Sequence, residues 1–157
     1  MNQEHSVLLR STFVRLYPLD QSVEGLSAYK TALETPENFV LKPQREGGGI
    51  KLANLGNNYY GEKVREKLNE MSANERNGYI LMDLIRPPPL RNTMIRKGMA
   101  IDCDVISELG IYGLWIGDGS VCFLNECGGH LLRTKSSLSN EGGVAAGFAV
   151  LDTPFLI

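Results

Sequence analysis

The first third of the chain combines two helical patterns with one strand-like pattern. Apolar residues at helical spacing predict a helix from about Glu4 to Leu16, whose inward face would carry Leu9, Phe13 and Leu16. A second helix is predicted from Ser22 to about Leu33, with an apolar face of Val23, Leu26, Tyr29 and Leu33. Pro36 ends this helix, and the run Asn38–Lys42 then predicts a short strand.

Strand-like patterns dominate after a third predicted helix, which runs from about Glu62 to Met71 and turns Val64, Leu68 and Met71 inward. Tyr79–Ile85 predicts a strand, and the three prolines that follow at 87–89 mark a turn or an edge, since proline cannot donate to a central ladder. Further strand-like runs cover 92–95, 100–109, 111–116 and 121–124, with Asp118-Gly119 as a hairpin signal. Helices followed by a largely antiparallel sheet predict an α+β fold, taken as a single segment 1–157.

Length and charge narrow the class of protein. The chain has 157 residues, enough for one ordinary domain, and its 43% hydrophobic content supports a packed core. A net charge of -2, from 16 basic and 18 acidic residues, argues against a broad nucleic-acid or membrane surface but allows a small phosphate site. No signal peptide or membrane-spanning run is visible, so we expect a cytoplasmic protein with small-molecule partners.

The chain has three cysteines, Cys103, Cys122 and Cys127. An odd number without regular spacing favours reduced thiols in a reducing compartment. Cys122 and Cys127 are followed by His130, but a zinc site needs a fourth ligand and usually a closer pair of cysteines. Packing within a strand or turn is therefore the preferred interpretation of these residues.

The run Lys42-Pro43-Gln44-Arg45-Glu46-Gly47-Gly48-Gly49 directly follows the predicted strand. At the end of that strand it brings together cations, a carboxylate suited to a metal, and three glycines that let the backbone approach a phosphate. The order differs from a P-loop, where the lysine follows the glycines, and from the spaced glycines of a dinucleotide fold. A candidate site for a nucleotide phosphate with Mg²⁺ and a plain flexible loop are both consistent with this run alone.

Four other segments carry candidate chemistry, each with a structural alternative. Glu108 lies in an apolar stretch and faces either a cleft or a sheet edge, and Arg133 and Lys135 share one face of a strand that is either ligand-binding or solvated. The glycine- and alanine-rich segment from Glu141 to Gly147 could close over a ligand with backbone N–H groups or form a tight turn. The segment Met82–Ile85 could hold a base by its backbone or serve the core.

No nucleophile is paired with a base by spacing, because neither His5 nor His130 has an obvious serine or cysteine partner. The chemistry that these residues favour is phosphoryl transfer by positioning and electrostatics, in which cations and Mg²⁺ neutralise the developing charge.

Several of these segments together resemble eukaryotic-type glutathione synthetase. The resemblance is carried, in order along the chain, by Phe39–Gly49, Asn57–Glu62, Tyr79–Met82, Ile106–Ile111, Gly129–Lys135 and the alanine-rich segment Gly142–Asp152. It implies the C-terminal portion of an ATP-grasp fold, with glycine-rich and alanine-rich lid loops. It also implies ATP-dependent joining of γ-glutamylcysteine and glycine into glutathione, ADP and phosphate through an acyl phosphate, with no covalent enzyme intermediate.

The resemblance also implies residue roles, assigned by position in this sequence. Mg²⁺ would be bound by Glu46, and the peptide substrate by Arg133 with the backbone of Val144 and Ala145. Arg133 and Lys135 would be the catalytic cations. The nucleotide would be contacted by Lys42, Pro43, Gln44, Arg45, Glu46, Gly47, Gly48, Gly49, Asn57, Asn58, Tyr60, Met82, Asp83, Leu84, Ile85, Glu108, Lys135 and Glu141.

Two departures from the family pattern bear on activity. The resemblance covers only the C-terminal part of such enzymes, which are several times longer, so the N-terminal region and its share of the site are not matched. The residues Ile50–Gly56 interrupt the glycine-rich loop where the family runs directly into Asn57-Asn58, as an unremoved intron or alternative splicing could produce. The alternative function is therefore a fragment that binds nucleotide weakly without turnover, and a homodimer is expected only of the full-length form.

Overall fold

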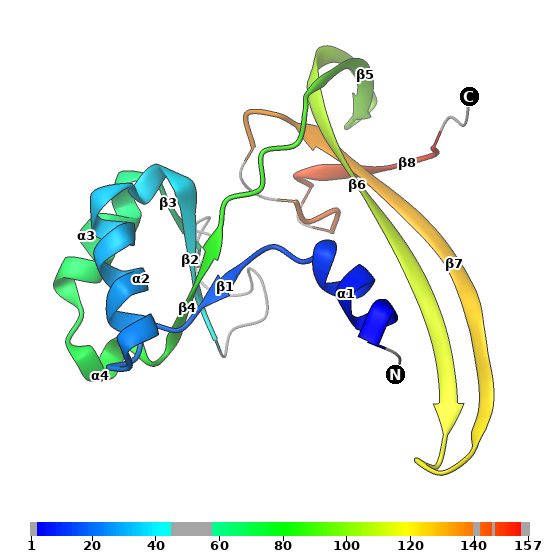
Figure 1. Cartoon of the computed structure of the whole chain (residues 1–157). Coiled ribbons are helices and arrows are strands. Elements are labelled where there is room, and N and C mark those ends of the chain that lie inside the picture. Colours follow the sequence, from blue (N-terminus) through cyan, green and yellow to red (C-terminus); the bar gives the residue numbers. More distant parts are fainter. Residues whose placement is uncertain (1–2, 45–57, 140–141, 146, 155–157) are drawn as a thin grey trace. The chain divides into compact units, whose positions relative to one another are not determined.

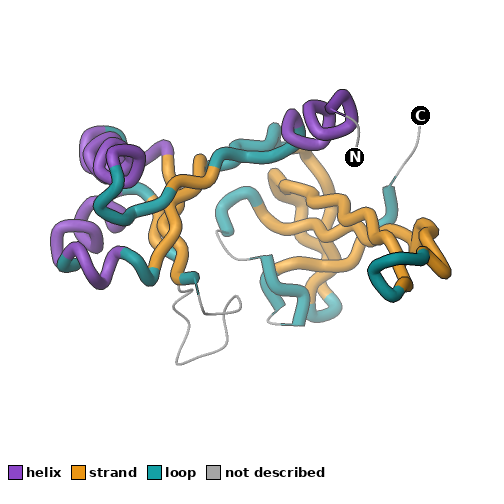
Figure 2. Tube along the Cα trace, turned by 60° about the horizontal axis from the view of Figure 1, so that its bottom comes forward, coloured by secondary structure: helices purple, strands orange, loops and turns teal. Residues whose placement is uncertain are grey.

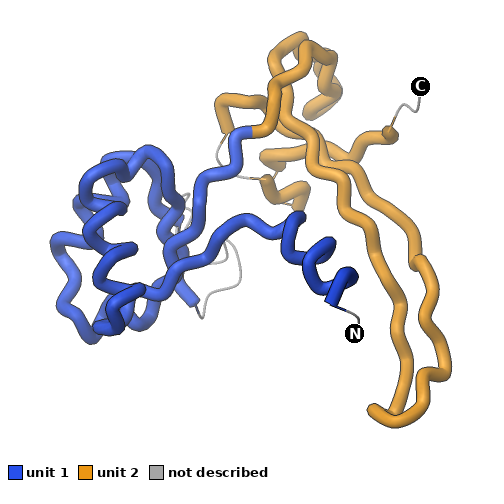
Figure 3. The backbone as a smooth tube through the Cα atoms, in the orientation of Figure 1, with its two compact units in different colours: residues 1–86 blue, residues 87–157 orange. Residues whose placement is uncertain are grey.

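The computed structural model describes residues 3–44, 58–139, 142–145 and 147–154. The chain divides into two compact units, Met1–Arg86 and Pro87–Ile157, coloured separately in Figure 3. The boundary falls at the three consecutive prolines, which have no N–H to extend a ladder. Each unit is built on an antiparallel four-stranded sheet. The antiparallel sheet predicted for the second half is confirmed, and the sheet of the first unit adds to it.

The first sheet has the strand order β1-β4-β2-β3 (Figure 1). Its strands are β1 (Leu16–Tyr17), β2 (Phe39–Pro43), β3 (Tyr59–Tyr60) and β4 (Tyr79–Asp83). The helices of this unit are α1 (Gln3–Ser11), α2 (Val23–Glu34), the 3-10 turn η1 (Pro36–Asn38), α3 (Glu62–Glu70) and α4 (Ala73–Arg76). Figure 2 shows α2 and α3 gathered on one side of these strands.

The core of the first unit lies between this sheet and its helices. Phe39, Leu41 and Leu81 point from the strands toward the helices. The helices and their connections supply Leu19, Ala28, Ala32, Val64, Leu68 and Met71 to the same cluster. The predicted inward face of the third helix is confirmed, because Val64, Leu68 and Met71 are all buried.

The predicted helix 4–16 is wrong beyond Ser11, where α1 ends. The Ser11 and Thr12 hydroxyls donate to the carbonyls of Leu8 and Leu9, at 2.7 and 2.8 Å, which competes with helix continuation. Leu16 instead lies in β1, opposite Met82. Consequently Leu9, Phe13 and Leu16 do not form a buried helical face, and all three are exposed.

The predicted inward face of the second helix is also partly wrong, because Val23 and Leu26 are exposed. The helix begins as expected, with the Ser22 hydroxyl accepting from the Gly25 N–H at 3.0 Å. Its buried residues are small: Gly25, Ala28 and Ala32. A Cβ at position 25 would lie 2.5 Å from the backbone oxygen of Asp20, so the close approach of the chain requires glycine there.

The second sheet has the order β5-β6-β7-β8. Its strands are β5 (Leu90–Arg96), β6 (Met99–Gly117), β7 (Cys122–Ser136) and β8 (Ala149–Asp152). The two predicted runs 100–109 and 111–116 are one 19-residue strand, because Gly110 continues the ladder opposite Leu131.

The hairpin predicted at Asp118-Gly119 is confirmed as the turn between β6 and β7. Oδ1 of Asp118 accepts from the backbone N–H groups of Ser120 and Val121, at 2.9 and 2.8 Å, and Gly119 has a φ of +93°. The hydrogen bonds from Val121 and Ser120 lower the pKa of Asp118 below its usual value.

Candidate functional site

One face of the first sheet is covered by helices, and the other carries several of the predicted nucleotide contacts. Directly paired residues of an antiparallel ladder point to the same side, and neighbours along a strand point to opposite sides. Leu41 belongs to the helix-side core, so Val40 faces the other way. Tyr60 and Met82, the ladder partners of Val40, share its face.

Lys42 lies on the same helix-free face, two residues beyond Val40 and opposite Ile80. Val40 is buried and Lys42 is half-buried. An apolar row of Val40, Met82 and Tyr60 with Lys42 further along the same face suits a flat aromatic base with an attached anion. The predicted position of Lys42, near the end of a buried strand, is confirmed.

Gln44 holds the end of this strand to the neighbouring strand. Its backbone N–H donates to the Gly78 carbonyl at 2.8 Å, and its side-chain Nε2 donates to the Tyr79 carbonyl at 3.3 Å. Pro43 pairs with Tyr79 as the last residue of β2. The segment that enters the glycine-rich loop is thus fixed up to Gln44. The side-chain amide of Gln44 is hydrogen-bonded to the protein backbone.

The segment Met82–Ile85 follows β4 with two of its N–H groups already engaged. The Asp83 N–H donates to the Arg15 carbonyl at 3.1 Å, and the Leu84 N–H donates to the Asn38 carbonyl at 2.8 Å. Among the described residues, no hydrogen bond uses the Ile85 N–H, and the Ile85 side chain is exposed. A ligand at this segment would therefore meet the Ile85 N–H and backbone carbonyls.

Asp83 is held by Tyr17 on the neighbouring edge strand β1, a contact that sequence reasoning missed. The Tyr17 hydroxyl donates to Oδ1 of Asp83 at 2.9 Å, and the Tyr17 ring packs edge-on against Phe39 with 5.9 Å between centroids. Burial, followed by the hydrogen bond to Asp83, raises the pKa of Tyr17. The Asp83 carboxylate is therefore a structural acceptor in this arrangement.

In the second unit, Glu108 and Arg133 face each other across β6 and β7. They are direct ladder partners, and a guanidinium nitrogen of Arg133 forms an ion pair with Oε1 of Glu108. Lys135 lies two residues further along β7, opposite Ile106, on the same face as Arg133. The shared face predicted for Arg133 and Lys135 is confirmed. The structure adds that the Glu108 carboxylate, on the neighbouring strand, holds Arg133 by an ion pair.

The predicted alanine-rich loop forms a turn that leads into β8. The Gly143 carbonyl accepts from the N–H groups of Phe148 and Ala149, at 3.0 and 3.3 Å, and the Val144 carbonyl accepts from Gly147 at 2.9 Å. Ala149 pairs with Lys135. Val144 and Ala145 are thereby brought to the end of the sheet that carries Lys135.

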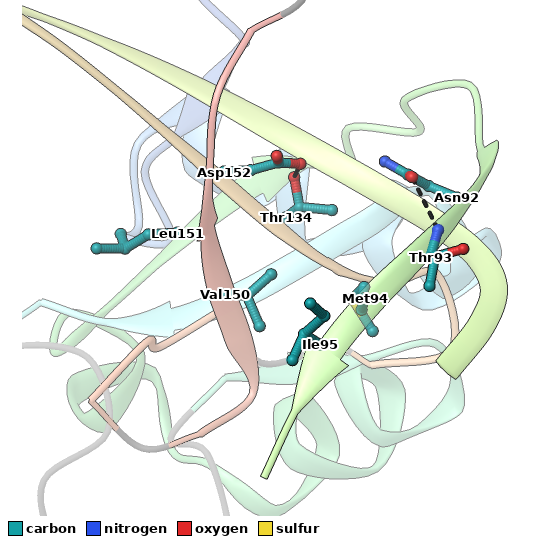
Figure 4. Close-up of a pocket in the computed structure, with 8 residues that line it drawn as sticks. All are labelled: Asn92, Thr93, Met94, Ile95, Thr134, Val150, Leu151 and Asp152. Atoms are coloured by element: carbon teal, nitrogen blue, oxygen red, sulfur yellow. Dashed lines mark hydrogen bonds between the residues drawn. The ribbon is translucent and has the colours of Figure 1, made fainter. Parts of the chain in front are cut away.

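The opposite face of the second sheet carries a polar network and a small pocket (Figure 4). The hydroxyl of Thr134, which is buried, donates to Oδ2 of Asp152 at 2.8 Å and lies 2.9 Å from the Ser107 hydroxyl. The pocket has a volume of about 200 Å³ and is lined by Asn92, Thr93, Met94, Ile95, Thr134, Val150, Leu151 and Asp152. Since Thr134 alternates with Arg133 and Lys135, this pocket is separate from the face that bears the two cations.

Several predicted site residues lie outside the described part of the chain. These are Arg45, Glu46, Gly47, Gly48, Gly49, Asn57 and Glu141, together with the insertion at 50–56. Asn58 is described and precedes β3, where Tyr60 pairs with Val40. Within the described ranges there is no group of three or more His, Cys, Asp or Glu residues that could hold a metal ion. No described helix is both long and apolar enough to cross a bilayer.

The chain matches the family model for the eukaryotic glutathione synthase ATP-binding domain over residues 1–156. It is 48% identical over 151 residues to glutathione synthetase of Xenopus laevis, a match that covers 95% of this chain and 30% of that protein. The human glutathione synthetase is 46% identical over 94% of the chain and 30% of the relative. The chloroplastic glutathione synthetase of Solanum lycopersicum is 43% identical over 99% of the chain and 27% of the relative.

A solved structure gives the same fold. The glutathione synthetase-like effector GSS30 from Globodera pallida, in its apo form, superposes with a TM-score of 0.68 at 22% identity, covering 98% of this chain and 30% of that one. The chain thus spans about 30% of the length of the curated relatives named above.

Proposed function

Since the chain belongs to the eukaryotic glutathione synthase ATP-binding domain family, we propose that it is the nucleotide-binding part of an ATP-dependent glutathione synthetase. The observation that carries the proposal is the helix-free face of the first sheet. There Lys42, Tyr60 and Met82 lie beside the buried Val40. A base would pack on the apolar row, and the Lys42 ammonium would attract the phosphates.

The base would be recognised by the backbone of Met82–Ile85. Because the N–H groups of Asp83 and Leu84 are engaged within the protein, the Ile85 N–H is the donor left for a base nitrogen, with a carbonyl of the same segment as the acceptor. Pro43, Gln44, Asn58 and Tyr60 would border the nucleotide. The phosphates would also be lined by Arg45, Gly47, Gly48, Gly49, Asn57 and Glu141, and Mg²⁺ by Glu46, where it would neutralise phosphate charge.

The second unit carries the remaining proposed contacts. Glu108 and Lys135 would contact the nucleotide, and Arg133 would bind a carboxylate of the peptide with the backbone of Val144 and Ala145. The ion pair of Arg133 with Glu108 supports this assignment, because it holds the guanidinium over the same face as Lys135. Positioned cations of this kind stabilise the charge that develops during phosphoryl transfer.

The proposed reaction proceeds in two balanced steps. The cysteinyl carboxylate of γ-glutamylcysteine takes the terminal phosphoryl group of ATP, which releases ADP and leaves an acyl phosphate. The glycine amine then attacks the acyl carbon, phosphate leaves with the bonding electrons, and the amine loses a proton as the amide forms. The residues proposed here position and stabilise charge, so no protein nucleophile takes part.

A second candidate function is favoured because the chain covers only 30% of the length of its relative. In it, the 157 residues bind nucleotide without turnover, because the rest of the peptide site is supplied by a region that this chain does not match. The insertion 50–56 would add to this loss by displacing Asn57 and Asn58 from the phosphates. Neither point alters the binding face on the first sheet.

An activity measurement distinguishes the two candidate functions. The chain is placed in the Xenopus laevis synthetase in exchange for the corresponding 30%, and phosphate release is measured with ATP, γ-glutamylcysteine and glycine. We expect release only when all three are present, and faster release when residues 50–56 are deleted. Phosphate release that does not depend on γ-glutamylcysteine and glycine would contradict the proposed reaction. The unmodified 157-residue chain is the control, and it is expected to be inactive.

The remaining proposals concern partners and compartment. The small net charge supports small-molecule substrates over nucleic acid or membrane partners. We expect the full-length protein to be a cytoplasmic homodimer, which light scattering of the joined protein and imaging of the tagged full-length protein would test.

A further inference from the structure

The segment Met82–Ile85 is anchored near its start by β1. The Arg15 carbonyl accepts from the Asp83 N–H at 3.1 Å, and the Tyr17 hydroxyl donates to Oδ1 of Asp83 at 2.9 Å. The Tyr17 ring is half-buried and packs edge-on against Phe39, with 5.9 Å between the ring centroids. The backbone at Asp83 is therefore held by one main-chain hydrogen bond and by one side chain that is itself fixed by packing.

The same segment is anchored at its other end by the residues that precede β2. The Leu84 N–H donates to the Asn38 carbonyl at 2.8 Å. The Arg86 guanidinium donates to the Glu37 carbonyl at 2.6 Å and to Oδ1 of Asn38 at 3.1 Å. The Ile85 N–H, which no hydrogen bond uses among the described residues, thus lies between two anchored residues.

The Tyr17 contact lies on the face of the sheet opposite to the proposed base site. Asp83 pairs with Phe39, whose side chain belongs to the helix-side core, and direct ladder partners point to the same side. The row formed by Val40 and its ladder partners lies on the other face. Tyr17 therefore reaches the base site only through the backbone of the segment, which makes it a positioning residue and not a ligand contact.

A backbone that is fixed in this way discriminates between the two purine bases. Adenine presents a ring nitrogen that accepts and an amino group that donates, whereas guanine presents a ring N–H that donates and a carbonyl that accepts. The Ile85 N–H and a carbonyl of the same segment match adenine and oppose guanine. A donor that faces a second donor loses about ten- to hundredfold in affinity, provided that the backbone cannot turn to present a carbonyl instead.

We propose that Tyr17 and Arg86 are positioning residues that set the preference for adenine over guanine, by holding the segment Met82–Ile85 from both ends. The inference rests on the proposed nucleotide function and deepens it. Removal of either anchor lets the Ile85 peptide group turn, so that guanine binds better relative to adenine. The attraction of the phosphates by Lys42 does not depend on these anchors, so the preference between bases should change more than the overall affinity.

The test is the ratio of two dissociation constants, measured by calorimetric titration of the 157-residue chain with Mg-ATP and with Mg-GTP. We expect the wild type to bind Mg-ATP at least about tenfold more tightly than Mg-GTP. Tyr17→Phe keeps the ring and removes the hydroxyl, and it should lower this ratio by about threefold or more. Arg86→Met should lower the ratio in the same direction. Because Arg86 is exposed, this variant keeps the test decisive if Tyr17→Phe does not fold.

Controls separate positioning from a general loss of stability. Tyr29→Phe removes a hydroxyl that has no hydrogen bond among the described residues of the same unit, and it should leave the ratio unchanged. Leu68→Ala weakens the helix-side core, so it should change both dissociation constants together and keep their ratio. Asp83→Ala removes the acceptor of the Tyr17 hydroxyl, so the double variant Y17F/D83A should lose no more selectivity than Asp83→Ala alone.

Several results would overturn the inference and leave the proposed function standing. They are a wild type that binds Mg-ATP and Mg-GTP equally, a ratio unchanged in Tyr17→Phe and Arg86→Met, and a parallel fall of both affinities in these variants. Additive losses in Y17F/D83A would show that Tyr17 does not act through Asp83. A wild type that binds neither nucleotide, alone or exchanged into the Xenopus laevis synthetase, would overturn the proposed function and the inference with it.

Discussion

Removing the Tyr17 hydroxyl tests how the segment Met82–Ile85 is held. Tyr17→Phe keeps the edge-on packing against Phe39 and deletes the 2.9 Å hydrogen bond to Asp83. A hydrogen bond to a charged group contributes about 1.5–3 kcal/mol, and we take the lower end because the pair is only part-buried. A loss of about 1.5 kcal/mol in a unit of this size lowers the melting temperature by roughly 6–12 °C.

The effect should also depend on pH. The folded-state pKa of Tyr17 is raised above the usual tyrosine value of 10.0, mainly by burial and then by the hydrogen bond to Asp83. The stabilisation is therefore fully present below the unfolded pKa and is lost as the pH rises through the folded pKa. Thermal unfolding followed by circular dichroism should show a constant gap between wild type and Tyr17→Phe from pH 7 to 9, narrowing at more alkaline pH.

The control is Tyr112→Phe, because Tyr112 is exposed and its hydroxyl has no hydrogen bond among the described residues. It should leave the melting temperature unchanged. The account of Tyr17 is refuted if Tyr17→Phe melts like the wild type at pH 7, or if the gap persists undiminished at the highest pH at which the chain folds.

Three further predictions address the packing and the turns. Leu68→Ala should destabilise the first unit by about 2–5 kcal/mol in denaturant unfolding, because Leu68 is fully buried; a loss as small as that of the exposed control Leu138→Ala would contradict the helix-side core. Ser72→Ala should cost about 0.5–2 kcal/mol through loss of the capping box with Glu75, and an unchanged midpoint would count against the cap. The pKa of Asp118, measured by NMR, should lie below the usual aspartate value of 3.8. Asp118→Ala should therefore loosen the β6–β7 turn above pH 3.8 and match wild type below the folded pKa. A normal or raised pKa of Asp118 would contradict the turn hydrogen bonds.

The elements that the sequence predicts well are those whose stability is local. The third helix follows from the spacing of Val64, Leu68 and Met71 alone, and the hairpin at Asp118-Gly119 follows from turn chemistry. The ends of the first helix and the buried face of the second depend on distant contacts. Leu16 lies in β1 because it pairs with β4. β1 has only two residues, which is too short for a sequence pattern to predict.

The candidate site is predictable in its residue types but not in its geometry. Lys42 at a strand exit and the shared face of Arg133 and Lys135 follow from strand alternation. The pairings of Tyr17 with Asp83 and of Arg133 with Glu108 depend on register between strands, which is fixed by long-range packing. Thr134 is buried and donates a hydrogen bond to Asp152, but no sequence pattern distinguishes it from an exposed threonine.

The most direct test of the nucleotide-binding face is a calorimetric titration of the chain with Mg-ATP. Lys42 lies on the helix-free face of the first sheet, whereas Lys63 is an exposed lysine on α3. Losing one charge-assisted contact of about 1.4 kcal/mol raises Kd about tenfold, so Lys42→Ala should bind Mg-ATP about ten times more weakly than wild type, and Lys63→Ala should bind like wild type. Equal affinities of the two variants for Mg-ATP would contradict the assignment of this face to the nucleotide.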